Sequence, residues 1–427
     1  MTATPDAQSR PAGADWLGAL IVFGPLLLTT FGAKLAAPAG PPDIPLSFYG
    51  ILALFALGLA TRRLVVDTDR LLVFSLMLAV LGALQVLRPG PWSAPSLLMM
   101  ATLYACYVVG MPAGAFDQQR ALRLFLNVTS VIAIAGILQF FAQFVIGPQL
   151  AFPVDYLLPD RLLVDGYMNL NVLSYGSSTH KANGVFLLEA SFFSQLLAMA
   201  VLAELVSHNR LHRLAIYAMG MMVAYSGTGI LILLATLPVL ALTQRRGDMV
   251  LLGVIGLLTA IVLYEPLNLE LFVKRATEFK STQSSGFERF VGAAYFFDQF
   301  LWTDTARSLF GVGAGMMKAF EGRAHLPVHE SALTKIIFEY GLIGALLNIG
   351  FLFFCLARTH APPVLKLGVA VMFFMAGIYT PSSHGIALSL MFWPSPGGEP
   401  LRLRRPLPEL MMRLGLHPKR KLGGHPQ

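Results

Sequence analysis

The sequence predicts an all-α integral membrane protein, a polytopic bundle of about twelve transmembrane helices with two long segments on one side of the membrane. Three observations predict this fold class. The chain of 427 residues is 56% hydrophobic and only 13% charged, its mean hydropathy is +0.66, and uncharged runs of about 20 residues, the length that crosses a bilayer, recur along it. These values disfavour a soluble globular domain.

The uncharged runs define the elements of the bundle. We expect spans at 16–36, 44–61, 71–87, 95–111, 121–146, 184–206, 213–226, 227–243, 249–265, 331–357, 364–380 and 383–394. The seventh and eighth belong to one apolar stretch that is too long for one helix, and the sequence YSGTG at 225–229 interrupts it. Two short helices that meet at this glycine-rich bend are therefore predicted. Residues 1–15 and 395–427 are expected to form tails outside the bundle, which occupies 16–394.

Lysine and arginine residues indicate the orientation of the bundle. Most of them fall in the tails and in alternate short connections between spans, as in the cytoplasmic segments of membrane proteins. Both termini are therefore expected in the cytoplasm, and residues 1–15, which lack a small-residue cleavage site, are interpreted as a retained cytoplasmic tail. The net charge of +8 fits this topology, so nucleic acid is not expected as a partner.

Two long segments, 147–183 and 266–328, fall on the opposite side, where long loops of a compact membrane protein usually carry function. In the second segment, aromatic and apolar residues recur at helical spacing after Arg289. They predict an amphipathic helix in the headgroup layer. Such a helix either guides a lipid-linked substrate or packs against the bundle.

Glu189 is a candidate functional residue because it is expected about one and a half turns inside the span 184–206. An ionisable group at that depth is unfavourable unless it faces a polar cavity or a partner. The alternative is an ion pair with a basic residue of a neighbouring helix. His180 and Lys181, just before this span, either contact a substrate or extend to the interface as ordinary flanking residues.

Arg289 and a glycine-rich run offer two further candidates. A guanidinium at headgroup depth binds a phosphate through two hydrogen bonds, although contact with bulk lipid headgroups is the alternative.

The run LFGVGAGMM at 309–317 lacks the preceding strand and the following Lys-Ser/Thr pair of a nucleotide loop. Gly311 and Gly313 within it permit a tight turn or the close approach of a substrate, or the run simply returns the chain to the membrane.

The stretch HLPVHESALTKIIFEYGLIG at 325–344 places several charges at the mouth of the span 331–357. It is not a zinc motif, because Leu333 stands where the second histidine of H-E-x-x-H must be. Lys335 and Glu339 are spaced to pair on one helix face, and Glu330 is expected in the first helical turn. His329 is left without a structural explanation.

Cys106 and Cys355 lie in apolar runs and are expected to be core residues.

Four stretches in order, KANGVFLLEASFFSQ, YSGTGILILL, RFVGAAYFFDQFLWTDTARSLFGVGAGM and HESALTKIIFEYGLIG, resemble the bacterial O-antigen ligase and Wzy-type polysaccharide polymerase superfamily. The resemblance covers roughly residues 120–380. Ala190 stands where that family often has proline, and Gly227-Thr228 replaces its usual serine-arginine. The first stretch is more similar to exopolysaccharide polymerases than to ligases.

The resemblance implies a GT-C-like bundle in the bacterial inner membrane. Its substrate would be an undecaprenyl-diphosphate-linked oligosaccharide, polymerised on the periplasmic side without a metal or other cofactor, with chain-length regulators and export proteins as possible partners. Arg289 and Lys181 would stabilise the departing diphosphate, and Glu189 or His329 would act as the base. Asn183, Gly311, Gly313 and Trp302 would contact the diphosphate or the glycan.

Two alternatives remain. A ligase would transfer the glycan to lipid A core or to a protein, and no residue distinguishes this acceptor. A transporter or flippase is disfavoured, because the sequence shows no internal repeat and few charges within the spans.

Overall fold

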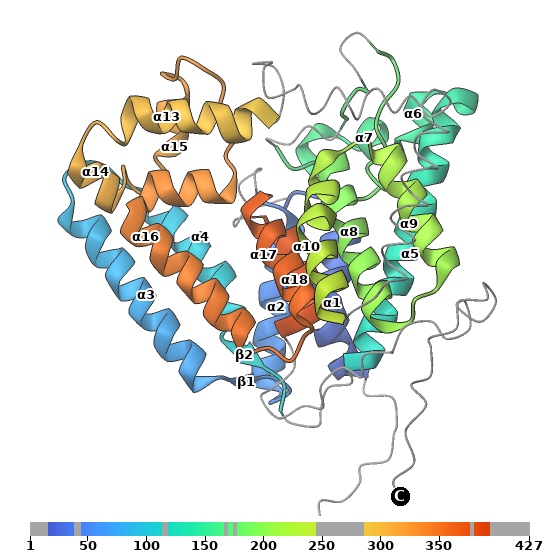
Figure 1. The fold of residues 1–427 in the computed structure, drawn as a ribbon, viewed down its shortest axis with the longest axis horizontal. Helices are drawn as coiled ribbons and strands as arrows, with labels where there is room; N and C mark the ends of the chain where they lie inside the picture. The colour runs from blue at the N-terminus through green and yellow to red at the C-terminus, as the bar shows by residue number, and fades with distance from the viewer. Residues whose placement is uncertain are drawn as a thin grey trace, which may run out of the picture.

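The computed structural model describes residues 16–37, 44–112, 118–165, 170–173, 177–244, 286–375 and 380–392, and these are mostly helical (Figure 1). The helices of the bundle are α1 (Trp16–Phe31), α2 (Leu46–Ala60), α3 (Thr68–Leu87), α4 (Ala94–Ala105), α5 (Gln118–Ile146), α8 (Ala190–Ser207), α9 (Leu211–Ala224), α10 (Gly227–Gln244), α16 (Ala332–Ala357), α17 (Pro363–Met375) and α18 (Pro381–Ala387), which continues as a π-helical turn (Leu388–Phe392). The shorter elements are β1 (Val65–Val66), β2 (Val109–Gly110), α6 (Pro148–Ala151), α7 (Pro153–Leu157), a π-helical turn (Phe287–Gly292), α13 (Ala293–Phe300), α14 (Thr305–Phe310) and α15 (Met317–Glu321).

The helices agree with a membrane protein. Within the described ranges, α3, α5, α8 and α16 are long and apolar enough to cross a bilayer, and several shorter helices are also apolar. Every predicted span falls on one of the helices except 249–265, which lies outside the described residues. The mostly helical fold class is therefore confirmed. Some predicted ends are wrong: α8 begins at Ala190 rather than at 184, and the residues after α4 leave the helix to form β2.

The predicted bend at 225–229 is confirmed. Helix α9 ends at Ala224, Tyr225 adopts a left-handed conformation with φ of 42°, and α10 begins at Gly227. The amide of Gly229 donates to Ser194 Oγ at 3.1 Å. A side chain at Gly229 would strike the Ser194 carbonyl, so glycine lets α10 approach α8 this closely. Helix α8 is thereby enclosed by α5, α9, α10 and α17 and forms the centre of the core.

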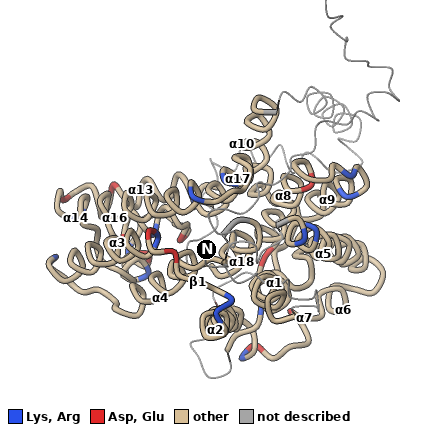
Figure 2. The backbone as a smooth tube through the Cα atoms, turned by 90° about the horizontal axis from the view of Figure 1, so that it is seen from below, with Lys and Arg blue, Asp and Glu red and all other residues tan. Residues whose placement is uncertain are grey.

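The two ends of the bundle differ in character. At one end β1 pairs with β2, and Arg358 after α16 meets Asp69 at the start of α3, with Nη2 2.8 Å from Oδ2. Figure 2, seen from below the view of Figure 1, shows lysine and arginine near α2, α5 and α9 at this end. The short helices α6, α7, α13, α14 and α15 lie at the other end (Figure 1). The described parts of both long loop segments predicted from the sequence therefore lie at the same end.

Candidate functional site

Arg289 and His329 come together at the end that carries the short helices. Arg289 belongs to the π-helical turn before α13, and His329 lies in the extended chain before α16. The amide of His329 donates to the carbonyl of Glu288 at 3.1 Å, which ties the two segments together through the backbone. As a result Arg289 Nη2 lies 3.4 Å from His329 Nε2. His329 is predicted at the mouth of the span 331–357 and Arg289 at headgroup depth, and the structure places the two side chains in contact.

The environment of His329 keeps its imidazole neutral. Burial, together with the positive charge of Arg289, lowers the pKa of His329 to about 3. With Nε2 facing a guanidinium donor, the ring proton belongs on Nδ1, which is buried and has no hydrogen-bond partner among the described residues. His329 can therefore accept a hydrogen bond at one nitrogen and donate one at the other.

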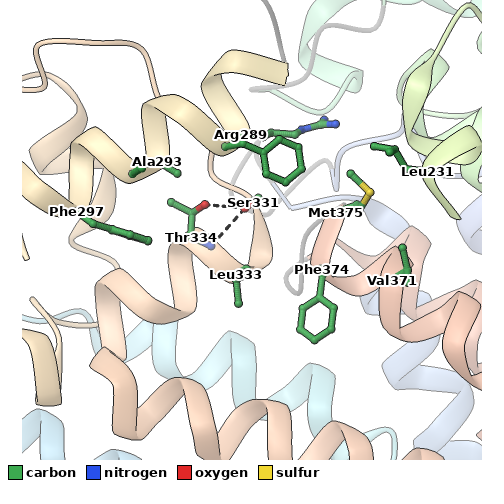
Figure 3. A pocket seen from close by; sticks show the side chains of 12 residues that line it. Leu231, Arg289, Ala293, Phe297, Ser331, Leu333, Thr334, Val371, Phe374 and Met375 are labelled. Carbon is green, nitrogen blue, oxygen red and sulfur yellow. Dashed lines mark hydrogen bonds between the residues drawn. The ribbon is translucent and has the colours of Figure 1, made fainter. Parts of the chain in front are cut away.

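An apolar cavity of about 460 Å³ lies beside this pair. It is lined by Leu231, Arg289, Phe290, Ala293, Ala294, Phe297, Ser331, Leu333, Thr334, Val371, Phe374 and Met375. Figure 3 shows the Arg289 side chain reaching across the top of the cavity toward Leu231 of α10. The hydroxyls of Ser331 and Thr334 are 2.7 Å apart, and Ser331 Oγ also accepts the Thr334 amide as the N-cap of α16. The cavity thus suits an apolar chain whose anionic head meets Arg289.

Glu189 lies at the start of α8, not inside it. The prediction that Glu189 lies about one and a half turns inside the helix of the span 184–206 is wrong, because residues 184–189 form turns and bends. The side chain of Asn183 accepts the amide of Val185 at 3.1 Å, and Gly184 and Val185 both adopt φ of 69°, so no helix can begin there. Glu189 is the N-cap residue, a position where the helix dipole favours a carboxylate, and Ser191 Oγ donates to it at 2.9 Å.

Glu189 is connected to the cavity through α10. Thr228 Oγ1 at the start of α10 donates to the carbonyl of Ser191 at 3.1 Å, two residues after Glu189. Three residues farther along α10, Leu231 lines the cavity. Glu189 itself is not among the residues that line the cavity.

Asn183 and Lys181 differ in how far they can reach a ligand. Asn183 is only 1% exposed, and it exchanges two hydrogen bonds with the Gln139 side chain of α5, at 2.9 and 3.1 Å. Asn183 therefore has a structural role, which is to fix the chain before α8, and its contact with a substrate stays a prediction. The backbone of Lys181 donates to the carbonyl of Asn171 at 2.8 Å, and its side chain is half-buried.

Gly311 and Gly313 also have a structural role where a ligand contact was predicted. Both are buried, and α16 is broken beside them at Gly341, whose φ is 67°. The amides of Val312 and Gly313 donate to the carbonyls of Phe338 and Glu339 at 2.8 and 3.0 Å. A side chain at Gly311 would strike the Glu339 carbonyl. The glycine-rich run is thus the partner of the broken helix.

The remaining predicted residues are near the surface or paired. Trp302 follows α13, is 42% exposed and lies edge-on to Phe297, with ring centroids 5.6 Å apart. The predicted Lys335–Glu339 ion pair is confirmed, with Nζ 3.7 Å from Oε1. Glu330 is not in the first helical turn as predicted, since it precedes the N-cap Ser331. It accepts a hydrogen bond from Lys335 Nζ at 2.9 Å instead.

Sequence reasoning missed a buried ion pair between the end of α1 and α7. Lys34 Nζ lies 2.8 and 2.6 Å from the two carboxylate oxygens of Asp155, and the two side chains are only 1% and 2% exposed. The available signal was a single lysine inside the predicted span 16–36. The pair joins the end of α1 to α7, in the segment that leads toward Lys181.

A metal site in the described ranges would need several ligand side chains close together. No three histidine, cysteine, aspartate or glutamate side chains gather there as ligands. Cys106 and Cys355 are buried free thiols, in agreement with the expectation of core positions.

Compared with known proteins, the chain matches no protein-family model and no curated protein sequence. Its function is therefore inferred from its own residues and their geometry.

Proposed function

We propose that this protein is a membrane-embedded glycosyltransferase that polymerises oligosaccharide repeat units carried on a polyprenyl diphosphate. The observation that supports this most is the contact between Arg289 and His329 beside an apolar cavity of about 460 Å³. A lipid diphosphate combines an apolar chain with an anionic head, and the cavity and the guanidinium match these two parts.

The proposed reaction transfers one glycan to another. A hydroxyl of the acceptor attacks the anomeric carbon of the donor, a new glycosidic bond forms, and the bond from that carbon to the diphosphate breaks. The electron pair of the broken bond leaves with the polyprenyl diphosphate, and a base takes the hydroxyl proton. Arg289 stabilises the charge on the leaving group, and the base is Glu189 or His329.

Arg289 also links diphosphate binding to the proton affinity of His329. The guanidinium is one cause of the low pKa of His329. A bound diphosphate offsets that positive charge, so it raises the proton affinity of the imidazole at the moment the substrate arrives. His329 then shares a proton with the phosphate or with the acceptor hydroxyl.

The proposed orientation follows from the distribution of charge. The end of the bundle with β1 and β2, which carries Arg62 and Arg63 between α2 and β1 and Arg358 after α16, would face the cytoplasm of a bacterium, together with both termini. Arg289 and His329 would then face the periplasm, where lipid-linked oligosaccharides are joined. Twelve crossings fit this arrangement, since an even number returns the chain to the cytoplasm.

Reconstitution with one defined lipid-linked repeat unit tests the proposal. The protein in proteoliposomes should convert the donor into a ladder of longer lipid-linked products and release polyprenyl diphosphate. A single transfer to an added lipid A core or protein acceptor would instead identify a ligase. Movement of the donor across the bilayer without a new glycosidic bond would refute glycosyl transfer.

A further inference from the structure

A second cavity, of about 320 Å³, lies against another face of α13. Its walls are formed by Tyr295, Asp298 and Gln299 of α13 and by residues 324–326. At about 100° per residue, Tyr295 and Gln299 face away from Ala294 and Phe297, which line the apolar cavity, and Asp298 lies at the side of the helix between the two faces. Helix α13 therefore lies between two cavities, and the wall of the second combines Phe296 and Tyr295 with the polar side chains of Asp298, Gln299 and His325.

Hydrogen bonds and core packing hold the wall of the second cavity in place. Gln299 Nε2 donates to the carbonyl of Arg323 at 3.2 Å, and Gln299 Oε1 accepts the amide of His325 at 3.2 Å. Below it, Phe296 is 1% exposed and packs against Phe338 of α16, with ring centroids 4.4 Å apart. The cavity is thus held by both backbone and core contacts.

Three exposed side chains in the wall of this cavity can contact a ligand. Tyr295 is 57% exposed, and Asp298 and His325 are also exposed. In the part of the chain that the structure describes, none of the three forms a hydrogen bond through its side chain. The cavity therefore offers one aromatic face, one carboxylate with two acceptor oxygens and one imidazole.

These groups suit the chemistry of a sugar ring. A sugar presents an apolar face of C–H bonds, which packs on an aromatic ring, and an edge of hydroxyls, which donate to a carboxylate and exchange bonds with an imidazole. The volume lies at the small end of the range for ligand sites, roughly 300–1,000 Å³. The carboxylate of Asp298 disfavours an acidic sugar, so a neutral sugar fits better.

The geometry points to a carbohydrate subsite formed by Tyr295, Asp298 and His325, which binds a neutral sugar residue of the glycan. This inference rests on the proposed glycosyl transfer for its biological substrate, and it adds where the glycan is held. Tyr295 and Asp298 are six and nine positions after Arg289, which at 1.5 Å per residue is roughly 9 to 14 Å along the helix axis. The sugar bound here is therefore not the one that is transferred, but one farther along the glycan.

Direct binding tests the subsite without any turnover. The probe is the free oligosaccharide released by mild acid from the lipid-linked intermediates of the host cell, titrated calorimetrically against the whole protein in nanodiscs. We expect binding that Tyr295→Ala and Asp298→Asn each weaken at least tenfold. Asp304→Asn is the matched control, because Asp304 is a half-exposed carboxylate just after α13 that pairs with Arg307 outside the cavity.

Turnover then distinguishes the two sources of the sugar. If the subsite holds the acceptor, both variants raise KM for the growing chain and leave KM for the lipid-linked donor unchanged. If it holds the donor, the reverse is observed. In either case kcat with a donor that carries a single sugar is unaffected, which a general folding defect would not allow.

The outcomes for the two proposals are separable. Oligosaccharide binding that depends on Tyr295 and Asp298 in a protein that shows no transfer would sustain the subsite and refute the glycosyltransferase. Transfer by a protein whose oligosaccharide binding and KM values are the same in Tyr295→Ala, Asp298→Asn and Asp304→Asn would overturn the subsite alone.

Discussion

Arg289 is the residue on which the proposed chemistry most depends, because it offers positive charge to a leaving diphosphate and contacts His329. Arg289→Ala should lower kcat/KM for a lipid-linked donor by about 100-fold or more, as expected for the loss of a preorganised charge. Arg289→Lys should recover part of this loss, since it keeps the charge but not the two-pronged hydrogen bonding. The control is Arg307→Ala, at a half-exposed arginine on α14. Equal turnover in Arg289→Ala and Arg307→Ala would remove Arg289 from the mechanism.

The second prediction concerns His329 and the pH dependence of the free energy of unfolding. Its pKa is about 3 in the folded protein, against 6.5 as the ordinary value. The unfolded chain therefore binds this proton more readily, so the free energy of unfolding should fall as the pH is lowered from about 6.5 toward 3. His329→Gln should reduce this fall, which chemical unfolding of the detergent-solubilised protein between pH 4 and 7 would detect. The same slope in both proteins would contradict the buried neutral imidazole.

The site residues show what local sequence can predict. Arg289 and His329 were identified because each has a charge or an imidazole at a helix mouth that local pairing does not explain. Glu189 was placed in the wrong environment, because the turn formed by Asn183 depends on a side-chain bond that apolar periodicity does not reveal. The Lys34–Asp155 pair joins residues 121 positions apart, a contact that neither local sequence specifies.

At the scale of elements, the break in α16 should be sensitive to side-chain size. Gly341 has φ of 67°, and a side chain there would strike the Leu309 carbonyl. Gly341→Ala should therefore destabilise the protein by about 2 kcal/mol or more. Gly350→Ala in the same helix is the matched control, because open space surrounds Gly350 and alanine is the better helix former. Thermal unfolding should give a lower Tm only for Gly341→Ala; equal Tm values would show that the break is not required.

The charges at the start of α16 should contribute to stability more than to turnover. Lys335 lies between Glu330 and Glu339, and Glu339 is fully buried. Lys335→Met would leave that carboxylate unpaired and should cost about 3 kcal/mol. Adding Glu339→Gln to this variant should recover part of the Tm. Activity per folded molecule should be retained in both, and its loss at an unchanged Tm would instead indicate that Lys335 contacts substrate.

Local sequence patterns predicted where helices begin and bend better than they predicted which residues contact one another. The bend at 225–229 and the start of α16 were located from glycine content and apolar run length. The role of Gly311 and Gly313 was not, because the carbonyls that they approach belong to a helix break some 30 residues later in the chain. The break at Gly341 was not predicted, because a glycine inside a mostly apolar helix does not by itself indicate a left-handed residue.

At the scale of the whole molecule, the proposed orientation predicts which end reacts with an impermeant reagent. Val65 in β1 is 42% exposed, and Asp160 after α7 is exposed at the other end. In intact spheroplasts, Asp160→Cys should react with a membrane-impermeant maleimide, and Val65→Cys should react only after permeabilisation. Cys106 and Cys355 are buried, so the unmodified protein provides the background. The reverse pattern would place Arg289 and His329 on the cytoplasmic side and refute the proposed reaction.

The alternation of apolar runs was enough to anticipate a helical membrane fold, because hydrophobic length is a property of each run by itself. How the runs assemble was not accessible in the same way. The central place of α8 depends on small contacts such as that between Gly229 and Ser194, and these arise only when two helices meet.

The broken helix α16 has a consequence for the order in which the chain is assembled during synthesis. The run at 309–317 leaves the ribosome before α16, and its amides bind the carbonyls of Phe338 and Glu339 at the break. The amide of Met317 also approaches the carboxylate of Glu339, at 3.4 Å. A bilayer offers no substitute for these donors. The run at 309–317 is therefore available to satisfy the break in α16 as soon as that helix is made. Substitutions that remove these donors should lower the yield of correctly folded protein before any defect in catalysis can be measured.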